Sequence, residues 1–453
     1  MEAVGPLVYR GAVPVFRSSN GSRPDGAAAS THAPGTLRAA LSHRSFRWVY
    51  AGTAASNVGT WMQNVTLGVL AYQLTGEAWF IGVLLFAQLG PSLLFSAVGG
   101  ALADRYDRRA IMVWIALSQL VLAFILAGVA LADDPNKIML VVLVALMGTG
   151  NALNGPTANA VLPTLVPRED LRGAVALNSA SMNFSRVFGP ILGGIVEVIG
   201  GASLVFAVNG LTYLFVVVAL MSVKADFSPP RSSHNSPWQQ VREGFSAVHA
   251  DRVLERIIFI ISVMSLVSLV FIYQMPKLAE EELGLDGWKY NILFASFGLG
   301  AGLGALAMGS FLSRLDRARA TRWGLVVLAL MLSIFATTSM PAVAFPSVFL
   351  LGAAYFVVVT ALLTTLQLRT EERVLGRVMG IWMMAWAGLV PVGGLIAGPF
   401  IDWFGMEIVL LVGAATALLL SFVDLRDPST TAEVVHTLET DEATDLALGE
   451  TAV

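Results

Sequence analysis

Three ionisable side chains interrupt long apolar segments of this sequence: Arg186, Glu197 and Asp402. A charged group within an apolar helix is costly, and such groups usually face a partner or a water-filled pathway. Arg186 shares a helical face with Asn178 and Gly189, so we interpret it as lining or sealing a pathway, with a purely structural tie as the alternative. Glu197 and Asp402 lie near the ends of their segments and are candidates for binding a proton, unless they are simple interfacial charges.

A cluster of charged residues follows the second apolar segment, where the chain reads GALADRYDRR (100–109). Arg side chains bridge to carboxylates or carbonyl oxygens, and a loop Asp near a helix N-terminus is favoured by the helix dipole. Such a cluster can hold two parts of a protein together. The alternative is a loop that only keeps its charges on one side of a membrane. The cluster consists of Gly100, Asp104, Arg105, Arg108 and Arg109.

Polar and aromatic residues recur at helical spacing within several of the apolar segments. In the first, Asn57, Trp61 and Asn64 lie three or four residues apart. Apolar walls with a few polar groups suit a drug-sized amphipathic ligand. Interhelical hydrogen bonds and packing are the alternative for each residue. The candidates for lining a substrate cavity are Asn57, Trp61, Asn64, Asn178, Thr360, Thr364, Gln367, Trp382 and Trp386.

The segments that carry these residues are long enough to cross a membrane. Of the 453 residues, 56% are hydrophobic and 13% are charged, whereas soluble domains carry about a quarter charged residues. This composition excludes an ordinary soluble enzyme. A helix needs about 20 apolar residues to cross a bilayer, and the sequence contains twelve such stretches. They are 47–72, 79–102, 110–132, 138–160, 174–199, 203–223, 256–276, 288–312, 321–340, 345–367, 377–401 and 405–424.

The basic residues predict the orientation of these spans. Of 28 Lys and Arg residues, Lys137, Lys277 and Lys289 lie in odd-numbered loops and Arg186 lies within a span. The remaining 24 lie in even-numbered loops and in the tails. Because cytoplasmic loops are enriched in Lys and Arg, we expect both termini in the cytoplasm.

The same pattern predicts five parts of the chain. Residues 1–44 and 426–453 lack a periodic apolar face and are expected to be disordered cytoplasmic tails, the second of them acidic. Residues 45–223 and 256–425 each hold six of the spans. Between them, 224–255 is expected to be a cytoplasmic linker with an amphipathic helix.

The two six-span parts resemble each other. After the second span of each part the chain reads GALADRYDRR (100–109) and GSFLSRLDRA (309–318). Parallel six-span repeats are typical of transporters, because two similar bundles can rock about a site between them. At an offset of 209, Gly100, Arg105, Asp107 and Arg108 match Gly309, Arg314, Asp316 and Arg317.

With these motifs the sequence resembles the major facilitator superfamily, and in particular its bacterial drug:proton antiporters and enterobactin-exporter-like proteins. The resemblance rests on the 100–109 cluster, on the stretch 56–76, and on a Gly-Pro motif in span five that is associated with exporters. It implies that Asp104, Arg105 and Arg108 latch two bundles together in the outward-facing state. The Gly-Pro motif consists of Arg186, Gly189, Pro190, Gly193 and Gly194.

The source of energy is predicted by elimination. Nothing in the sequence matches a phosphate-binding loop, and GAGLGA (300–305) lies within an apolar segment with no strand before it. We therefore expect no cofactor and no metal, and an ion gradient as the driving force. All five His residues lie in tails or cytoplasmic loops, which disfavours a histidine proton relay. The net charge of −3 provides no basic surface for nucleic acid.

Together these features predict an all-α membrane protein, with twelve transmembrane helices in two pseudo-symmetric six-helix bundles and cytoplasmic termini. We expect a monomeric, multi-pass secondary transporter of the cell membrane, which exports hydrophobic or amphipathic small molecules by proton-coupled alternating access. A dedicated siderophore or metabolite exporter, or an importer of the same fold, is the alternative. A polytopic membrane enzyme would need paired His and carboxylate residues at one membrane face, and the sequence offers none.

Overall fold

All regular structure in the described part of the chain is helical, which confirms the all-α class. Both predicted tails fall largely outside that part, as does half of the 309–318 repeat copy. The computed structural model describes residues 32–228, 237–285, 288–309 and 315–425.

The first half of the molecule is built by seven helices. Apolar side chains dominate them, because in a bilayer the backbone must satisfy its own hydrogen bonds and helices do so within one segment. The helices are α1 (Leu37–Ser42), α2 (Arg44–Thr75), α3 (Ala78–Leu89), α4 (Pro91–Arg105), α5 (Arg108–Val129), α6 (Lys137–Leu165) and α7 (Leu171–Ser222).

The linker helix and the second half follow. Two short π-helical turns interrupt the second half, one after α9 and one after α14. The elements are α8 (Pro237–Ala250), α9 (Arg252–Val263), η1 (Met264–Ser268), α10 (Val270–Glu281), α11 (Trp288–Gly309), α12 (Arg317–Thr337), α13 (Pro341–Arg369), α14 (Glu372–Met383), η3 (Met384–Gly388), α15 (Leu389–Phe404) and α16 (Met406–Leu420).

Nine helical segments of the described chain are long and apolar enough to cross a membrane. Helix α2, which carries the polar stripe, and the 15-residue α16 are not among the nine. Helix α7 counts once although it has 52 residues. Its backbone leaves the helical region at Gly200 and at Gly201, where φ is +66°, a value that favours glycine. This bend lies where the sequence predicts a break between two spans.

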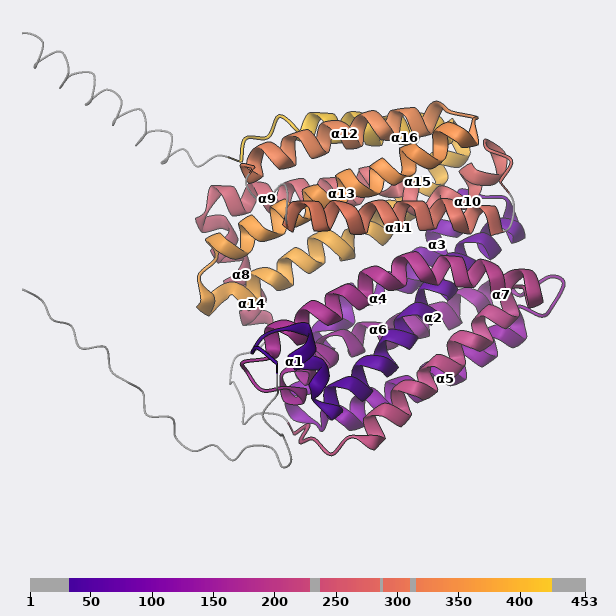
Figure 1. The fold of residues 1–453 in the computed structure, drawn as a ribbon. Coiled ribbons are helices and arrows are strands. Elements are labelled where there is room, and N and C mark those ends of the chain that lie inside the picture. Colours follow the sequence, from indigo (N-terminus) through magenta and orange to yellow (C-terminus); the bar gives the residue numbers. More distant parts are fainter. Residues whose placement is uncertain (1–31, 229–236, 286–287, 310–314, 426–453) are drawn as a thin grey trace, which may run out of the picture.

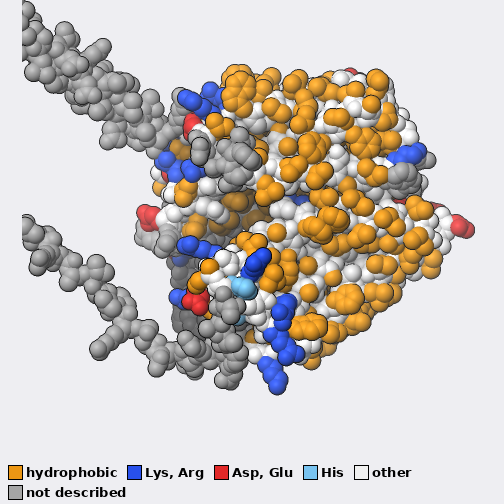
Figure 2. Space-filling view, in the orientation of Figure 1, with side chains coloured by type: hydrophobic (Ala, Val, Ile, Leu, Met, Phe, Trp, Pro, Cys, Tyr) orange, Lys and Arg blue, Asp and Glu red, His pale blue; other side chains and the backbone are white. Residues whose placement is uncertain are grey.

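The two halves lie side by side and meet at one end (Figure 1). Helix α15 packs against α3, α11 packs against α7, and α10 contacts α2 and α3. We call the end that carries Gly76, Lys277 and Asp402 the joined end. The opposite end, which carries Asp104 and Asp170, is the basic end. Figure 2 shows Lys and Arg gathered there and a hollow in the surface between the halves.

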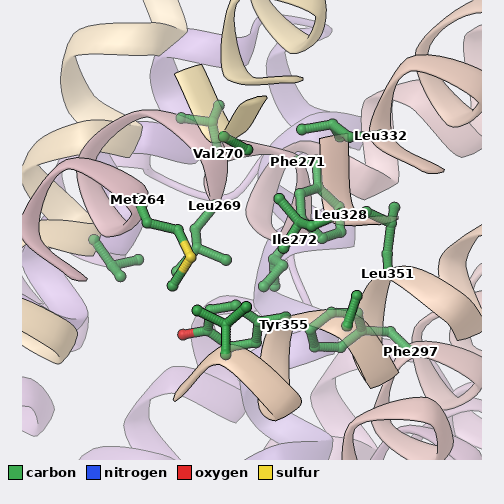
Figure 3. Packing of buried hydrophobic residues seen from close by; sticks show 14 of the residues in the cluster. Met264, Leu269, Val270, Phe271, Ile272, Phe297, Leu328, Leu332, Leu351 and Tyr355 are labelled. Carbon is green, nitrogen blue, oxygen red and sulfur yellow. The ribbon is translucent and has the colours of Figure 1, made fainter. Parts of the chain in front are cut away.

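The hydrophobic core shows the same asymmetry. One cluster fills the first half, whereas the cluster that fills the second half also takes in Val65, Val69, Ala78 and Leu85 of the first half. Figure 3 shows part of the second-half cluster, with Tyr355 beside Phe297. The shared residues come from α2 and α3, so apolar packing holds the halves together toward the joined end.

Large apolar side chains cover the outside of the molecule (Figure 2). Trp114, Leu131 and Ile138 are 72%, 75% and 76% exposed. Soluble proteins rarely expose apolar patches of this extent, and lipid is the solvent in which such a surface is stable. The chain is therefore a multi-pass membrane protein.

Residues 32–44 differ from the disordered tail that the sequence predicts. They contain α1, and Asp170 ties this segment to α7. Gly35 N donates to Asp170 Oδ1 at 3.0 Å, and His43 Nε2 lies 2.7 Å from Asp170 Oδ2. Burial alone would raise the pKa of Asp170, but the hydrogen bonds from His43 and Gly35 and the charge of His43 hold that pKa below its ordinary value. The buried carboxylate needs these donors, and they order the segment.

The linker contains the expected helix, α8, although residues 229–236 lie outside the described chain. Helix α8 packs on α14 rather than standing alone. Glu243 Oε2 lies 2.5 Å from Arg377 Nη1. At Gly244 a Cβ would lie 3.0 Å from the Arg377 carbonyl oxygen, so the two helices approach closely. The linker helix is thus fixed to the second half.

The described ends of the two repeat copies each place an aspartate at the start of a helix. Asp107 Oδ1 accepts from Ala110 N at 2.9 Å at the start of α5, and Asp316 Oδ1 accepts from Ala318 N at 3.3 Å at the start of α12. Their backbones are nearly identical, with φ/ψ of −57°/118° and −57°/124°. An N-terminal cap at matched positions supports the internal repeat.

Candidate substrate and coupling sites

Arg186 lies at the junction of the two halves, among aromatic rings. Its guanidinium carbon is 5.6 Å from the centre of the Trp61 ring in α2 and 5.0 Å from that of Phe356 in α13. Tyr273 and Tyr355 lie close enough to interact with it electrostatically. Arg186 Nε is buried without a hydrogen-bond partner. The predicted pathway residue is therefore surrounded by rings from both halves.

The Gly-Pro motif lets α7 approach its neighbours. A Cβ at Gly189 would lie 2.5 Å from Trp61 Cβ, and one at Gly193 would lie 3.3 Å from Met62 Cα. On another face, a Cβ at Gly194 would lie 2.9 Å from Asn291 Nδ2 of α11. Pro190 is buried between these glycines. The motif thus packs α7 against α2 within its own half and against α11 of the other half.

The cavity candidates of α2 lie close to this junction. Trp61 lies 6.1 Å, between ring centres, from Phe294 of the second half. Asn64 accepts a hydrogen bond from Gln88 of α3, so its polar group is satisfied within its own half. Asn57 is half-buried, and in the described chain no hydrogen bond occupies its amide.

The remaining candidates divide into two environments. Asn178, Thr360 and Thr364 are half-buried. Gln367 is exposed toward the basic end, where its Nε2 lies 3.8 Å from Met379 Sδ. Trp386 is half-buried and donates from Nε1 to the Tyr355 hydroxyl at 2.5 Å.

Trp382 is more deeply buried than Trp386, and its assignment to the cavity stays a prediction. It is 1% exposed, within the core of the second half. The prediction assumed regular α-helical spacing, which would stack the two rings one turn apart. The π-helical turn η3 (Met384–Gly388) begins two residues after Trp382 and contains Trp386, so the two rings are not related by a regular α-helical turn.

Glu197 lies where three helices meet. Thr66 Oγ1 donates to Glu197 Oε2 at 3.5 Å, and Asn291 Nδ2 lies 3.4 Å from the same oxygen. Thr66 belongs to the first half and Asn291 to the second. Asn291 Oδ1 is buried without a partner. Protonation of Glu197 would give that oxygen a donor, so this contact between the halves can respond to a proton.

Asp402 lies at the joined end and binds the start of a helix in the other half. Its Oδ1 accepts from Ala78 N at 2.9 Å and its Oδ2 from Trp79 N at 3.0 Å. Lys277 Nζ lies 3.2 Å from Asp402 Oδ1 and donates to the Gly76 carbonyl at 3.0 Å. A carboxylate at a helix N-terminus satisfies free N–H groups and the helix dipole. Asp402 therefore caps α3 across the two halves.

Further hydrogen bonds accompany that cap. Gln274 Nε2 donates to the Ala78 carbonyl at 3.0 Å, and the Tyr72 hydroxyl donates to Glu281 Oε1 at 3.0 Å. A pocket of about 680 Å³ opens beside them, lined by residues that include Lys277 and Asp402. The joined end is thus closed by polar as well as apolar contacts.

The predicted latch divides into bonded and unbonded members. Arg108 donates to the carbonyls of Ala103 and Ala160, each at 3.0 Å. Arg109 Nη2 donates to the carbonyls of Val223 and Ala225 at 2.6 and 2.9 Å.

Asp104 and Arg105 are exposed instead. Within the described residues they make no hydrogen bond or ion pair. At Gly100, no atom lies within 4 Å of an added Cβ. The two arginines that follow therefore brace their own half, whereas Asp104 and Arg105 have no polar partner among the described residues.

The sequence pattern did not indicate several residues that lie at the junction. Phe356 lies four and eight residues before Thr360 and Thr364, so extending that polar face by one turn would have found it. Asn291 has no polar neighbour three or four residues away that would mark it, whereas Tyr273 lies one helical turn before Lys277. In the described part of the chain, no group of three His, Asp or Glu residues is placed to hold a metal ion.

Comparison with known proteins decides the family. The family described as "Transmembrane secretion effector", within the major facilitator superfamily, matches residues 35–443. The chain belongs to this family. Its members are transporters, and the chain is a transporter of small molecules rather than an enzyme.

Individual relatives agree with this assignment. The enterobactin exporter EntS of Escherichia coli O1:K1 is 28% identical over 402 residues, which cover 85% of this chain and 93% of the relative. The same exporter from Shigella boydii serotype 4 is 27% identical over the same coverage. The alignments cover most of this chain and nearly all of each relative.

Solved structures share the fold. A variant of the nucleoside transporter NupG matches with a TM-score of 0.70 at 14% identity, covering 84% of this chain and 98% of that one. A bacterial homologue of the human lysosomal transporter Spinster, in an inward-facing conformation, matches with a TM-score of 0.65 at 16% identity, covering 85% and 99%. The fold is that of major facilitator transporters.

Proposed function

We propose that this transmembrane secretion effector exports hydrophobic or amphipathic small molecules by alternating access, driven by a proton gradient. The observation that carries the proposal is the aromatic site around Arg186 and Trp61, which lies between two halves whose described residues pack together mainly toward one end. A site between two rocking bundles is how secondary transporters expose a substrate to each side in turn.

The proposed topology has twelve spans and cytoplasmic termini. Helix α7 supplies two spans on either side of Gly200 and Gly201, and α2 and α16 supply one each, which brings the nine candidates to twelve. At about 1.5 Å per residue, the 52 residues of α7 exceed two bilayer cores of about 30 Å. The Lys and Arg at the basic end favour the cytoplasm, and a monomer in the cytoplasmic membrane completes the proposal.

With that orientation the structure corresponds to an inward-facing state. The joined end is the outer end, and Asp402 and Lys277 close it. The hollow between the halves in Figure 2 opens toward the basic, cytoplasmic end. A substrate would enter there, and the Gly100–Arg105 segment would close that end in the outward-facing state.

Proton coupling is proposed at Glu197. The carboxylate lies in the contact between the halves, beside an Asn291 oxygen that lacks a donor. A proton entering from outside would give this oxygen a donor and so stabilise the contact, and its release to the cytoplasm would weaken the contact. Asp402 is the second candidate, because it also bridges the halves.

A dedicated siderophore exporter is the second candidate function. It is favoured by the relatives named as enterobactin exporters, which align over 85% of this chain. The two functions share the fold and the mechanism, and they differ in the breadth of substrates accepted.

Counterflow in proteoliposomes, with and without an imposed pH gradient, tests the proposal. We expect exchange of several unrelated amphipathic compounds, accelerated by the gradient. Exchange of a single catecholate compound would favour the siderophore exporter. Glu197→Gln should keep counterflow but lose the acceleration, with the exposed Glu407→Gln as control. Full proton-driven transport by both Glu197→Gln and Asp402→Asn would exclude these two carboxylates as coupling sites.

A further inference from the structure

The structure assigns to Arg186 the role of an anion-binding group. We infer that the transported molecules carry a negative charge, such as a carboxylate or a sulfonate, attached to an aromatic or apolar body. This inference rests on the proposed transport function and narrows its substrate class.

The first observation is that Arg186 has no counterion. In the described part of the chain none of its nitrogens makes a hydrogen bond or an ion pair, and Nε is a buried atom without a partner. Glu197, the carboxylate further along α7, is three helical turns away, or about 16 Å. A charge withdrawn from water and left without a partner costs several kcal/mol. The positive charge of Arg186 is therefore not balanced by a neighbouring group of the described chain.

The aromatic neighbours compensate only part of that cost. Rings of Trp61 and Phe356 lie 5.6 and 5.0 Å from the guanidinium carbon. Each such cation–π contact contributes about 0.5–2 kcal/mol, and a ring provides no acceptor for the N–H groups. A bidentate carboxylate would supply both the charge and two acceptors.

Arg108 and Arg109 provide a comparison, because both have a structural role within their own half. Arg108 donates to two carbonyl oxygens, and Arg109 donates to two others while lying over the Phe227 ring. Arg109 thus has two carbonyl acceptors as well as a ring, although its Nε, like that of Arg186, is buried without a partner. Arg186 has the rings without the acceptors.

The guanidinium is also accessible from the junction. Arg186 keeps intermediate exposure although it lies between α2, α11 and α13. Its terminal nitrogens have no acceptor among the described residues, so they remain free to bind an anion that reaches the junction. Trp61, Phe294 and Trp386 supply apolar surface beside it. An anionic head on an aromatic body fits this combination of charge and rings.

A matched set of three ligands tests the inference on the purified full chain. The probes are 2-naphthoate, 2-naphthamide and 2-naphthamidine, which share one ring system and differ in charge. Isothermal titration would measure each dissociation constant. We expect the wild type to bind naphthoate at least tenfold more tightly than the amide, and the amidine most weakly. Arg186→Gln should abolish the tenfold difference.

Two further variants control this result. Arg186→Lys keeps the charge without the planar fork, so it should retain a reduced preference for naphthoate. The exposed Arg47→Gln removes one positive charge from the same half and should behave as the wild type. If Arg186→Gln does not fold, the wild-type ranking and Arg186→Lys still decide the question.

Three outcomes would overturn the inference. Equal binding of naphthoate and naphthamide by the wild type would do so, as would an unchanged preference in Arg186→Gln. Counterflow of the neutral amide with equal efficiency would also contradict it, while leaving the proposed function intact. Binding of none of the three probes would contradict the proposed cavity together with the inference.

Discussion

The two ends of this transporter carry similar charged groups. These groups are bonded to the other half at the joined end and exposed at the basic end. At the joined end, Asp402 caps the first turn of α3 across the halves and Lys277 bonds to the Gly76 carbonyl. At the basic end, Asp104 and Arg105 are exposed, and in the described chain they contact no partner. Each end thus offers a carboxylate and a cation near helix termini, and one of the two sets is engaged.

The space around glycine residues also differs between the two ends. A Cβ at Gly82 would lie 2.5 Å from the Gly394 carbonyl oxygen in the other half, whereas one at Gly100 would contact nothing within 4 Å. Glycine is needed for close approach at the joined end in this state. Under the proposed mechanism, the chain thus provides contacts for two arrangements of its halves. This structure shows the arrangement in which the joined end is closed.

The largest expected effect is that of Gly82→Leu. The added side chain collides with α15, and overpacking of this kind costs about 1–3 kcal/mol. We expect the joined end to open. A cysteine introduced at the buried Val69 would report the opening of the joined end, because the chain contains no other cysteine. Its labelling by a maleimide in detergent should accelerate about tenfold or more.

Gly100→Leu is the matched control for that prediction. Because no atom lies near Gly100 here, the substitution should leave labelling at Val69 unaccelerated and block transport by preventing closure of the basic end. If both leucine variants accelerated labelling alike, the two ends would not differ as described.

Asp402→Ala should have the next largest effect. It removes a cap worth about 0.5–2 kcal/mol and the ion pair with Lys277. Labelling of the Val69 cysteine should rise by roughly tenfold for a loss of about 1.4 kcal/mol, which lies within that range. Glu407→Gln, which removes an exposed acidic group at the same end, should change nothing. Unchanged labelling in Asp402→Ala would show that the cap does not hold the halves together.

Asp104→Asn should impair function without destabilising this state. The exposed carboxylate has no partner in the described chain, so the free energy of unfolding should change by less than about 0.5 kcal/mol. Transport in vesicles with an imposed gradient should fall about tenfold, since the outward-facing state loses its latch. Unimpaired transport would refute the latch.

The smallest effect concerns Asp170, which anchors α1. Its pKa is held below the ordinary value by His43 and Gly35 despite burial, so its stabilising contribution is complete above the unfolded pKa of about 3.9. That contribution is lost as pH falls through the lower, folded pKa. Asp170→Asn should release residues 35–43 at neutral pH, at a cost of about 1 kcal/mol.

Hydrogen exchange measures that release. Protection of residues 35–43, corrected for intrinsic rates, should fall in Asp170→Asn at pH 7 and in the wild type below about pH 4. Retained protection in the variant would mean that apolar packing of Ala39 and Ala40 holds α1 without the carboxylate.

Much of the fold could be predicted from local patterns. Apolar runs of sufficient length predict helices directly, and the break at Gly200 and Gly201 was placed between two predicted spans. The repeat at an offset of 209 predicted matching structure, and Asp107 and Asp316 cap their helices alike. Each of these signals lies within a short stretch of sequence. Such a stretch predicts its own helix or cap without information on how the halves pack.

The site was harder to predict, for two physical reasons. The predicted stacking of Trp382 and Trp386 assumed a regular α-helix, whereas Trp386 lies in a π-helical turn, and no residue type marks that turn. The contacts of Asp402 with Ala78 and of Asn291 with Glu197 join residues 324 and 94 positions apart. Such pairs depend on how the halves dock, which periodicity within one helix does not encode.

The central claim is that the two ends open and close in opposition, with Asp402 holding the joined end. Spin labels on introduced cysteines test it, one pair at exposed positions 73 and 282 of the joined end and one at 172 and 376 of the basic end. Double electron–electron resonance on the wild type and on Asp402→Ala would give both distances. We predict that Asp402→Ala lengthens the distance at the joined end and shortens the distance at the basic end. Distances that stay constant, or that change in the same direction at both ends, would contradict the account.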